Sequence, residues 1–157
     1  MGRLETPRNR GNNGSQGAES IQDVAGAQGF VRAYLDSDIL IWHLRGDERA
    51  RVLLRSLRAD PARRLCVGAL QRAEVVFFAK EAELPATRLL LSLFETVPVD
   101  AGIVDLGGEL YRSWNPSHGV DVADALLAAT VMTTGGKIHT LNVKHFPMPD
   151  LLVERAW

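Results

Sequence analysis

The chain of 157 residues has the length of one domain, and its 46% hydrophobic and 24% charged residues are typical of a globular protein. Its formal net charge of −1 excludes a general basic field, so any nucleic acid would have to bind a local patch. The single Cys66 excludes an intrachain disulfide and a cysteine-based zinc site, and it suits a reducing cytoplasm. We find no apolar segment long enough to span a membrane and no apolar run resembling a secretory signal.

The first 30 residues differ in composition from the rest of the chain. Gly, Asn, Gln and Ser dominate residues 11–17, and such a segment buries too little apolar surface to offset its chain entropy. We therefore predict a disordered tail over residues 1–30 and a folded domain over residues 31–157. A second hypothesis is that translation starts close to Val31, and an intact mass that includes the whole tail would contradict it.

The first predicted strand leads directly into a polar turn and a helix. Residues 31–35 are rich in β-branched and aromatic character, which indicates a short buried strand. Ser37 and Asp38 are good helix N-cap residues, and the apolar residues after them predict a helix that stops at Gly46. Asp36 would then lie at the carboxyl end of a strand, where open α/β sheets bind ligands. Asp36 and Asp38 could equally be only turn and cap residues.

The middle of the chain alternates helices with short strands. We predict helices over residues 48–59, 70–80, 85–95 and 101–114, a strand over residues 65–69, an edge strand at residues 97–99 and a loop over residues 115–119. Arg51, Arg55 and Arg58 share one face of the first of these helices. This face could contact phosphates, although a solvated helix face is the more common explanation.

Glu74 lies early in an otherwise apolar predicted helix. A carboxylate that faces a core is costly unless it is paired or binds a cation. Glu74 could instead face water, or pair with Arg72 or Arg88.

The last third contains a second polar start to a buried helix. Asp121 is a fair N-cap for a helix through Thr133, and Asp124 lies on the same face in its first turn, where the amide dipoles favour its ionised form. Two glycines end this helix, and a strand follows over residues 137–141 with Thr140 and Asn142 at its carboxyl end. Residues 151–153 are predicted to form a last strand.

This order of elements predicts a parallel sheet with helices on both faces. Asp36 and Asn142 would follow strands, whereas Glu74 and Asp124 would lie in first turns of helices, and all four positions converge on one edge of the sheet. Carboxylates brought together repel unless a cation neutralises them, and Mg²⁺ or Mn²⁺ suits an all-oxygen site. Such an ion can activate water for attack on a phosphodiester.

Two stretches resemble one known family. Residues 34–41, Tyr-Leu-Asp-Ser-Asp-Ile-Leu-Ile, are similar to the opening of PIN domains, above all the VapC-type toxins of prokaryotic toxin–antitoxin pairs. Residues 124–130 and 140–146 resemble the second signature of that family in order and spacing. The resemblance extends from about Ala33 to the C-terminus, and the segment around Glu74 is a looser match than the two ends.

The resemblance implies a three-layer α/β/α sandwich and a metal-dependent endoribonuclease that hydrolyses RNA with metal-activated water. Asp36, Glu74 and Asp124 would be the ligands of Mg²⁺ or Mn²⁺, and Asn142 lies where many members have a fourth aspartate. Ser37 and Thr140 match hydroxyl positions that support the acids, while Asp121 is outside this set and is interpreted first as a cap. The family also implies a homodimer and an antitoxin partner that covers the site.

Two other functions remain open from the sequence. The Asp-Ser-Asp run at residues 36–38 resembles the nucleophile motif of haloacid-dehalogenase phosphohydrolases. That class also needs a lysine, and no lysine of this chain lies in a matching sequence motif. The chain could also be a PIN-fold binding module without catalysis, although binding alone would not require three acids.

Overall fold

A computed structural model describes residues 29–157, so the prediction of a disordered tail lies almost entirely outside the described residues. Five parallel strands form one sheet in the order β3-β2-β1-β4-β5. The strands are β1 (Val31–Leu35), β2 (Arg63–Gly68), β3 (Glu95–Val97), β4 (Lys137–Thr140) and β5 (Val153–Arg155). Between them run α1 (Ser37–Leu44), α2 (Glu48–Ala59), α3 (Ala69–Phe78), α4 (Leu84–Leu91), α5 (Ala101–His118) and α6 (Val122–Thr134), with short 3₁₀ turns η2 (Glu81–Glu83) and η3 (Val143–His145).

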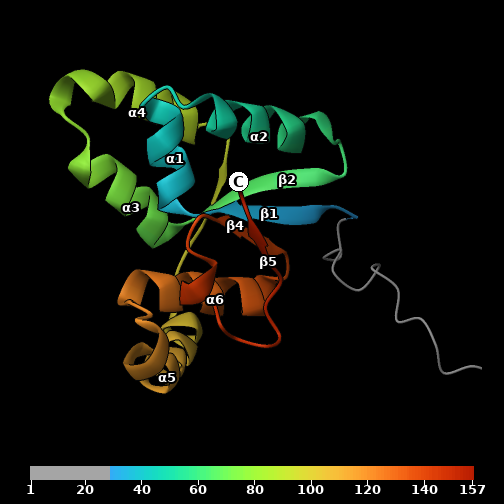
Figure 1. The fold of residues 1–157 in the computed structure, drawn as a ribbon, viewed down its shortest axis with the longest axis vertical. Helices are drawn as coiled ribbons and strands as arrows, with labels where there is room; N and C mark the ends of the chain where they lie inside the picture. The colour runs from blue at the N-terminus through green and yellow to red at the C-terminus, as the bar shows by residue number, and fades with distance from the viewer. Residues whose placement is uncertain (1–28) are drawn as a thin grey trace, which may run out of the picture.

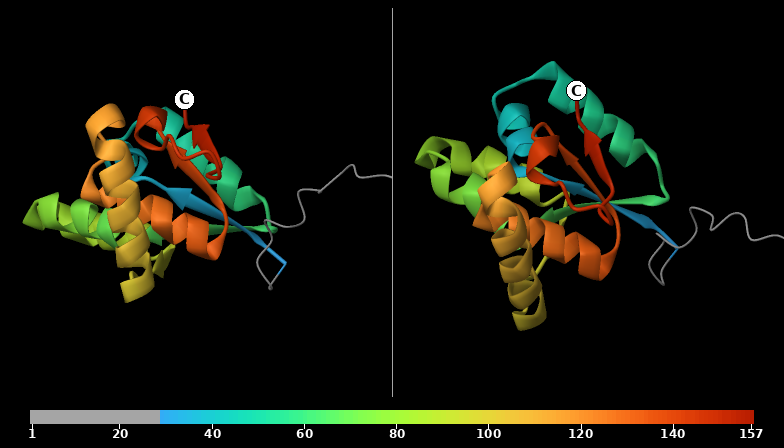
Figure 2. Two further views of the ribbon diagram at one scale, coloured as in Figure 1. Left: turned by 90° about the horizontal axis from the view of Figure 1, so that it is seen from below. Right: turned by 60° about the horizontal axis from the view of Figure 1, so that its bottom comes forward.

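The helices cover the two faces of the sheet in separate groups. Helices α1 to α4 lie on one face, and α5 and α6 lie on the other (Figure 1). The rotated views show the same two groups with the sheet between them (Figure 2). The protein has a hydrophobic core on each face of the sheet, and successive residues of β1 point into different cores. Leu35 packs in the core with α1 to α4, and Tyr34 packs in the core with α6. The predicted parallel α/β/α architecture is therefore confirmed.

Side-chain caps fix several helix starts where the sequence predicted them. Asp100 begins α5 by accepting a hydrogen bond from the N–H of Ile103 at 2.9 Å, and Asp121 begins α6 in the same way. Helix α2 has the predicted bounds. The first cap is different: Asp36, rather than Ser37 or Asp38, is the N-cap of α1.

Several predicted boundaries were wrong. The loop expected over residues 115–119 is the last turn of α5, which continues through Pro116 to His118. Gly119 then ends the helix in the left-handed conformation with φ of 67°. Helix α4 stops at Leu91, so the edge strand β3 starts earlier than expected, and β5 comes two residues later.

Within residues 29–157, none of the helices is both long and apolar enough to cross a membrane.

Candidate active site

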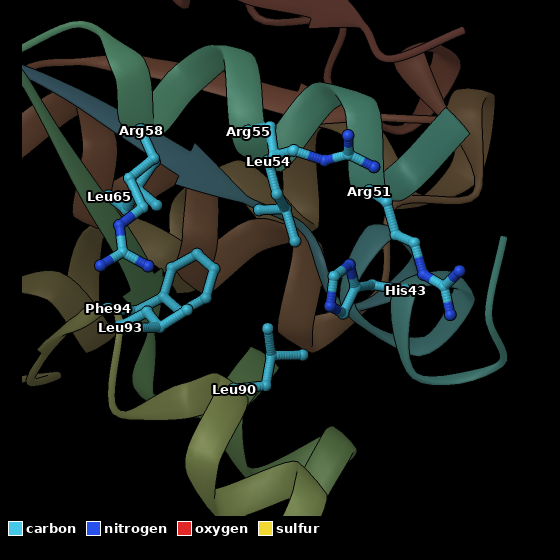
Figure 3. Close-up of a pocket in the computed structure, with 9 residues that line it drawn as sticks. All are labelled: His43, Arg51, Leu54, Arg55, Arg58, Leu65, Leu90, Leu93 and Phe94. Carbon is cyan, nitrogen blue, oxygen red and sulfur yellow. The ribbon is translucent and has the colours of Figure 1, made fainter. Parts of the chain in front are cut away.

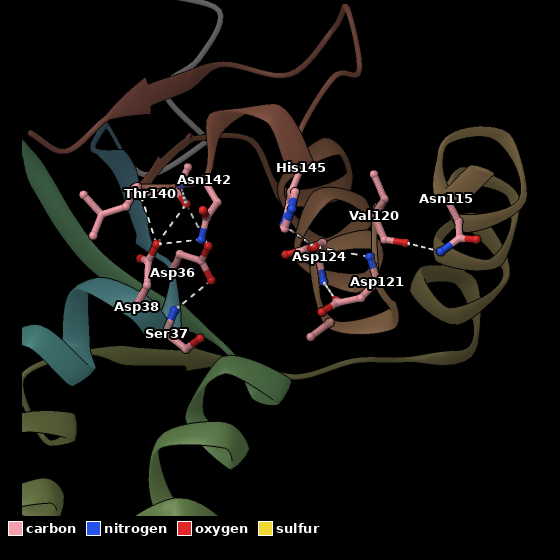
Figure 4. Close-up of polar contacts among 12 residues, drawn as sticks. Asp36, Ser37, Asp38, Asn115, Val120, Asp121, Asp124, Thr140, Asn142 and His145 are labelled. Carbon is pink, nitrogen blue, oxygen red and sulfur yellow. Dashed lines mark hydrogen bonds and ion pairs between the residues drawn. The ribbon is translucent and has the colours of Figure 1, made fainter. Parts of the chain in front are cut away.

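Asp36 lies at the carboxyl end of β1, in the middle of the sheet, and only 6% of it is exposed. One oxygen, Oδ1, accepts a hydrogen bond from the N–H of Ser37 at 2.8 Å, which also caps α1. The other, Oδ2, accepts one from the hydroxyl of Thr140 at 2.8 Å (Figure 4). Because β1 and β4 are neighbours in a parallel sheet, their ends bring Asp36 and Thr140 together across 104 positions of sequence.

Asp124 approaches the same region from the start of α6. It forms a reciprocal capping box with Asp121: the Asp124 N–H donates to Oδ1 of Asp121 at 2.8 Å, and the Asp121 N–H donates to Oδ2 of Asp124 at 3.2 Å. Oδ2 of Asp124 also lies 3.1 Å from Nδ1 of His145, which belongs to η3 (Figure 4). The cap predicted for Asp121 is therefore confirmed, and its side chain also orients Asp124.

Glu74 is further along its helix than the sequence suggested. Helix α3 begins at Ala69, so Glu74 lies in the second turn and not in the first. Burial raises the pKa of Glu74, and a hydrogen bond from Ser37 partly offsets this effect. Within residues 29–157 it forms no ion pair, and Arg72 donates instead to the hydroxyl of Thr96 at 2.9 Å. The alternative that Glu74 pairs with Arg72 is therefore not supported.

The acids are close enough to perturb one another electrostatically. Burial and then the charge of Asp38 raise the pKa of Asp36 to about 7, with a smaller contribution from Asp124. Burial also raises the pKa of Asp124, although the backbone N–H of Asp121 and His145 oppose it. The helix start favours the ionised form of Asp124, as expected, but desolvation is the larger effect and raises the pKa. These carboxylates are therefore expected to bind either protons or a cation, because their ionised forms are otherwise unfavourable.

The structure brings two further residues to this edge that the sequence did not single out. Asp38, expected to be at most a turn or cap residue, directs its side chain at the end of β4 (Figure 4). His145 contacts Asp124, although no histidine spacing in the sequence suggested a site. Both contacts join distant segments, and the only available signal was the carboxylate two positions after Asp36.

Asn142 lies beside these residues, just after β4. Its N–H donates to the Thr140 hydroxyl oxygen at 2.9 Å, and its side-chain nitrogen lies 3.4 Å from Oδ2 of Asp38. Among the described residues, no three acidic, histidine or cysteine side chains are close enough to form a ready-made metal ligand set. The structure thus places the predicted residues at one edge of the sheet without showing how they would hold an ion.

Comparison with known proteins identifies related chains. The family model of the PIN domain matches residues 33–146. The chain is 37% identical over 119 residues to Ribonuclease VapC19 of Mycobacterium tuberculosis, which covers 74% of this chain and 94% of that protein. It is 36% identical over 119 residues to Ribonuclease VapC10 of the same organism, which covers 75% of this chain and 88% of that protein.

Solved structures share the fold at lower sequence identity. VapBC2 from Rickettsia felis, bound to a DNA fragment from its promoter, matches with a TM-score of 0.67 and 20% identity, covering 79% of this chain and 98% of that one. DNA-bound VapBC from Salmonella typhimurium matches with a TM-score of 0.67 and 19% identity, covering 82% of this chain and all of that one. Both the family model and the relatives span most of the described residues, and the chain belongs to the PIN-domain family.

Proposed function

We propose that this chain is an endoribonuclease toxin of the VapC type, which hydrolyses phosphodiester bonds in RNA with the help of a divalent cation. The observation that carries the proposal is that Asp36 and Asp124 lie at one edge of a PIN-family sheet, with Glu74 near enough to contribute to the raised pKa of Asp124. Two relatives that are more than a third identical over the 119 aligned residues are named ribonucleases, which supports the same activity. We expect it to act in the cytoplasm, where RNA is available.

The residues of the site fit a hard divalent cation such as Mg²⁺ or Mn²⁺. Asp36 and Asp124 are both buried carboxylates with raised pKa values, so a nearby positive charge would stabilise their ionised forms. Carboxylate oxygens are the ligands that these ions prefer. Asp36, Glu74 and Asp124 would hold the ion, which supplies activation of water and neutralises charge on the phosphate.

The other residues of the site would orient these carboxylates. The Thr140 hydroxyl donates to Asp36, Ser37 hydrogen-bonds both Asp36 and Glu74, and the Asp121 side chain holds the backbone of Asp124. Thr140 comes from a distant part of the chain and holds the carboxylate of Asp36 in place, an arrangement that reduces reorganisation on binding. Asn142 adds an amide without charge at the same edge.

The nuclease is tested by incubating the purified chain with a structured RNA in Mg²⁺ or Mn²⁺. We expect cleavage that EDTA stops and that excess Mg²⁺ restores. A folded, antitoxin-free chain that binds the RNA but cuts it under none of these conditions would favour the binding module without catalysis. The haloacid-dehalogenase alternative predicts instead release of phosphate from small phosphomonoesters, and the PIN-family match gives it no support.

An antitoxin is the partner that this function requires, and a pocket between α2 and α4 suits a peptide segment of such a protein. The pocket has a volume of about 280 Å³ and an apolar floor beneath three arginines of α2 (Figure 3). The residues that line it are His43, Arg51, Leu54, Arg55, Arg58, Leu65, Leu90, Leu93 and Phe94. Arg51 and Arg55 pair with Glu48, while Arg58 forms no ion pair within residues 29–157. We expect a segment with apolar side chains flanked by carboxylates to bind there.

Replacing Leu93 by glutamate should weaken binding of the antitoxin by at least about tenfold, because a carboxylate would be buried against apolar side chains. Leu93 is 44% exposed in the free chain, so the change should leave folding and RNA cleavage intact. Calorimetric titration with the purified antitoxin partner measures the effect. Val104→Glu, at an exposed site on the opposite face, is the matched control and should bind normally. Equal affinities for the two variants would contradict this assignment.

A homodimer is also part of the proposal. Phe77 and Phe78 are consecutive at the end of α3 and are 81% and 83% exposed in the single chain, as expected for side chains that a second subunit covers. Light scattering should give the mass of a dimer for the wild-type chain and of a monomer for Phe77→Glu. If light scattering finds the wild-type chain to be a monomer even at about 100 times the concentration of the cleavage assay, the homodimer is contradicted.

A further inference from the structure

The carboxylate of Asp38 is the meeting point of three consecutive residues from the far end of the chain. Its Oδ2 accepts a hydrogen bond from the N–H of Leu141 at 3.0 Å, and it lies 3.4 Å from Nδ2 of Asn142 and 3.5 Å from the hydroxyl of Thr140 (Figure 4). The side chain of Asp38 therefore joins the first turn of α1 to the segment that leaves the sheet after β4.

Capping of α1 does not explain this side chain. The N-cap is Asp36, whose Oδ1 accepts the N–H of Ser37. Asp38 instead reaches across to β4, where burial raises its pKa and where its charge raises the pKa of Asp36. Holding a second carboxylate beside Asp36 is costly, so its contact with residues 140–142 is the interaction that offsets this cost.

The end of β4 and the segment after it carry residues that touch two of the site acids. The Thr140 hydroxyl donates to Oδ2 of Asp36, and His145 lies 3.1 Å from Oδ2 of Asp124. Asp38 binds the start of this segment through Leu141, and Asp124 contacts its end. The contact between Asp38 and Leu141 therefore lies directly between Thr140 and Asn142 in the chain.

We infer that Asp38 is a positioning residue of the proposed metal site: through Leu141 it holds the end of β4 so that Thr140 and Asn142 face Asp36. The inference rests on the proposed function, but it concerns a residue outside the three acids assigned as ligands. What it requires at position 38 is a hydrogen-bond acceptor of the right length. An asparagine keeps such an oxygen and an alanine does not.

Two measurements on the full chain test this role. The first is the affinity for Mg²⁺ and Mn²⁺ by calorimetry, which should fall about 10–100-fold in Asp38→Ala and stay within about threefold of wild type in Asp38→Asn. The second is hydrogen exchange of the Leu141 amide in the metal-free chain by NMR. It should be about tenfold faster in Asp38→Ala and little changed in Asp38→Asn. Cleavage should follow the same order, as a loss in kcat.

Asp100→Ala is the matched control. It removes an aspartate that accepts one backbone N–H, from Ile103 at the start of α5, so it imposes a comparable loss of stability elsewhere. It should change neither the ion affinity nor the exchange of Leu141.

Ion binding by the Asp38 variants and by the wild-type chain distinguishes a failure of this inference from a failure of the proposed function. An Asp38→Ala chain that binds the ions as tightly as wild type would overturn the inference alone. Equal losses of ion affinity in Asp38→Asn and Asp38→Ala would also overturn it, because the charge at position 38, and not its hydrogen-bond acceptor, would then determine the affinity. A wild-type chain that binds neither ion would overturn the inference together with the metal-dependent function.

Discussion

Replacing Asp36 and Asp124 together by asparagine should reduce RNA cleavage by at least about 10³-fold, because a metal ion supplies several kcal/mol of charge stabilisation in the transition state. Both residues are buried at the same edge of the sheet, and the charge of Asp124 contributes to the raised pKa of Asp36. The double variant would leave Glu74 as the only one of the three proposed ligands. The rate of cleavage of a structured RNA in Mg²⁺, under single-turnover conditions, measures the loss.

The double variant should still fold. Asparagine is as good an N-cap as aspartate, so position 36 can still accept the N–H of Ser37, and position 124 can still accept that of Asp121. Circular dichroism and binding of the same RNA check that only the chemistry is lost. Asp100→Asn, which alters a cap on α5, is the control and should cut at the wild-type rate. A double variant that cuts RNA within tenfold of wild type would exclude these acids as ligands.

In the absence of metal, Asp36 should make the chain less stable as the pH rises. Its pKa is about 7 in the folded chain, against a usual value of 3.8, so the folded state binds the proton more tightly than the unfolded state does. The free energy of unfolding therefore falls between about pH 4 and pH 7, and the loss is complete above that range. Asp36→Asn removes this penalty, and it should be more stable than wild type at pH 8 by an amount on the order of 2 kcal/mol.

Urea unfolding of both chains in EDTA, at pH 4 and pH 8, measures this difference. Other groups titrate in both proteins, so the gap between the two chains isolates Asp36. Mg²⁺ should raise the stability of wild type at pH 8, since it binds the folded state, and should do so far less for the variant. A gap between the two chains that does not widen from pH 4 to pH 8 would show that Asp36 is not the buried, repelled carboxylate described above.

The sequence predicted the position of the site because strand ends are simple to locate. An apolar run followed by short polar residues placed Asp36 after β1, and a parallel order of strands brought it to Thr140 and Asn142. The small apolar residues of α6 and the polar residues before them placed Asp121 and Asp124 at a buried helix start. These features depend on local pattern and on the topology that follows from it.

The remaining features depend on packing between distant segments. Asp38 accepts a hydrogen bond from a residue 103 positions away, and His145 meets Asp124 only because η3 folds back towards α6. The balance between burial and the helix dipole at Asp124 requires the depth of the site, which no spacing reveals. The end of α5 was misplaced because Pro116 and Gly119 indicated a loop, whereas the helix continues through Pro116 and ends at Gly119. The roles of the site residues themselves stay predictions.

The most direct measurement is the anomalous diffraction of a crystal of this chain grown or soaked with Mn²⁺. The proposed function predicts a peak within coordination distance of carboxylate oxygens of Asp36, Glu74 and Asp124, and its loss in the Asp36→Asn, Asp124→Asn variant. A wild-type crystal with no peak at this edge of the sheet, or with its peak among other residues, would contradict the assignment of the site.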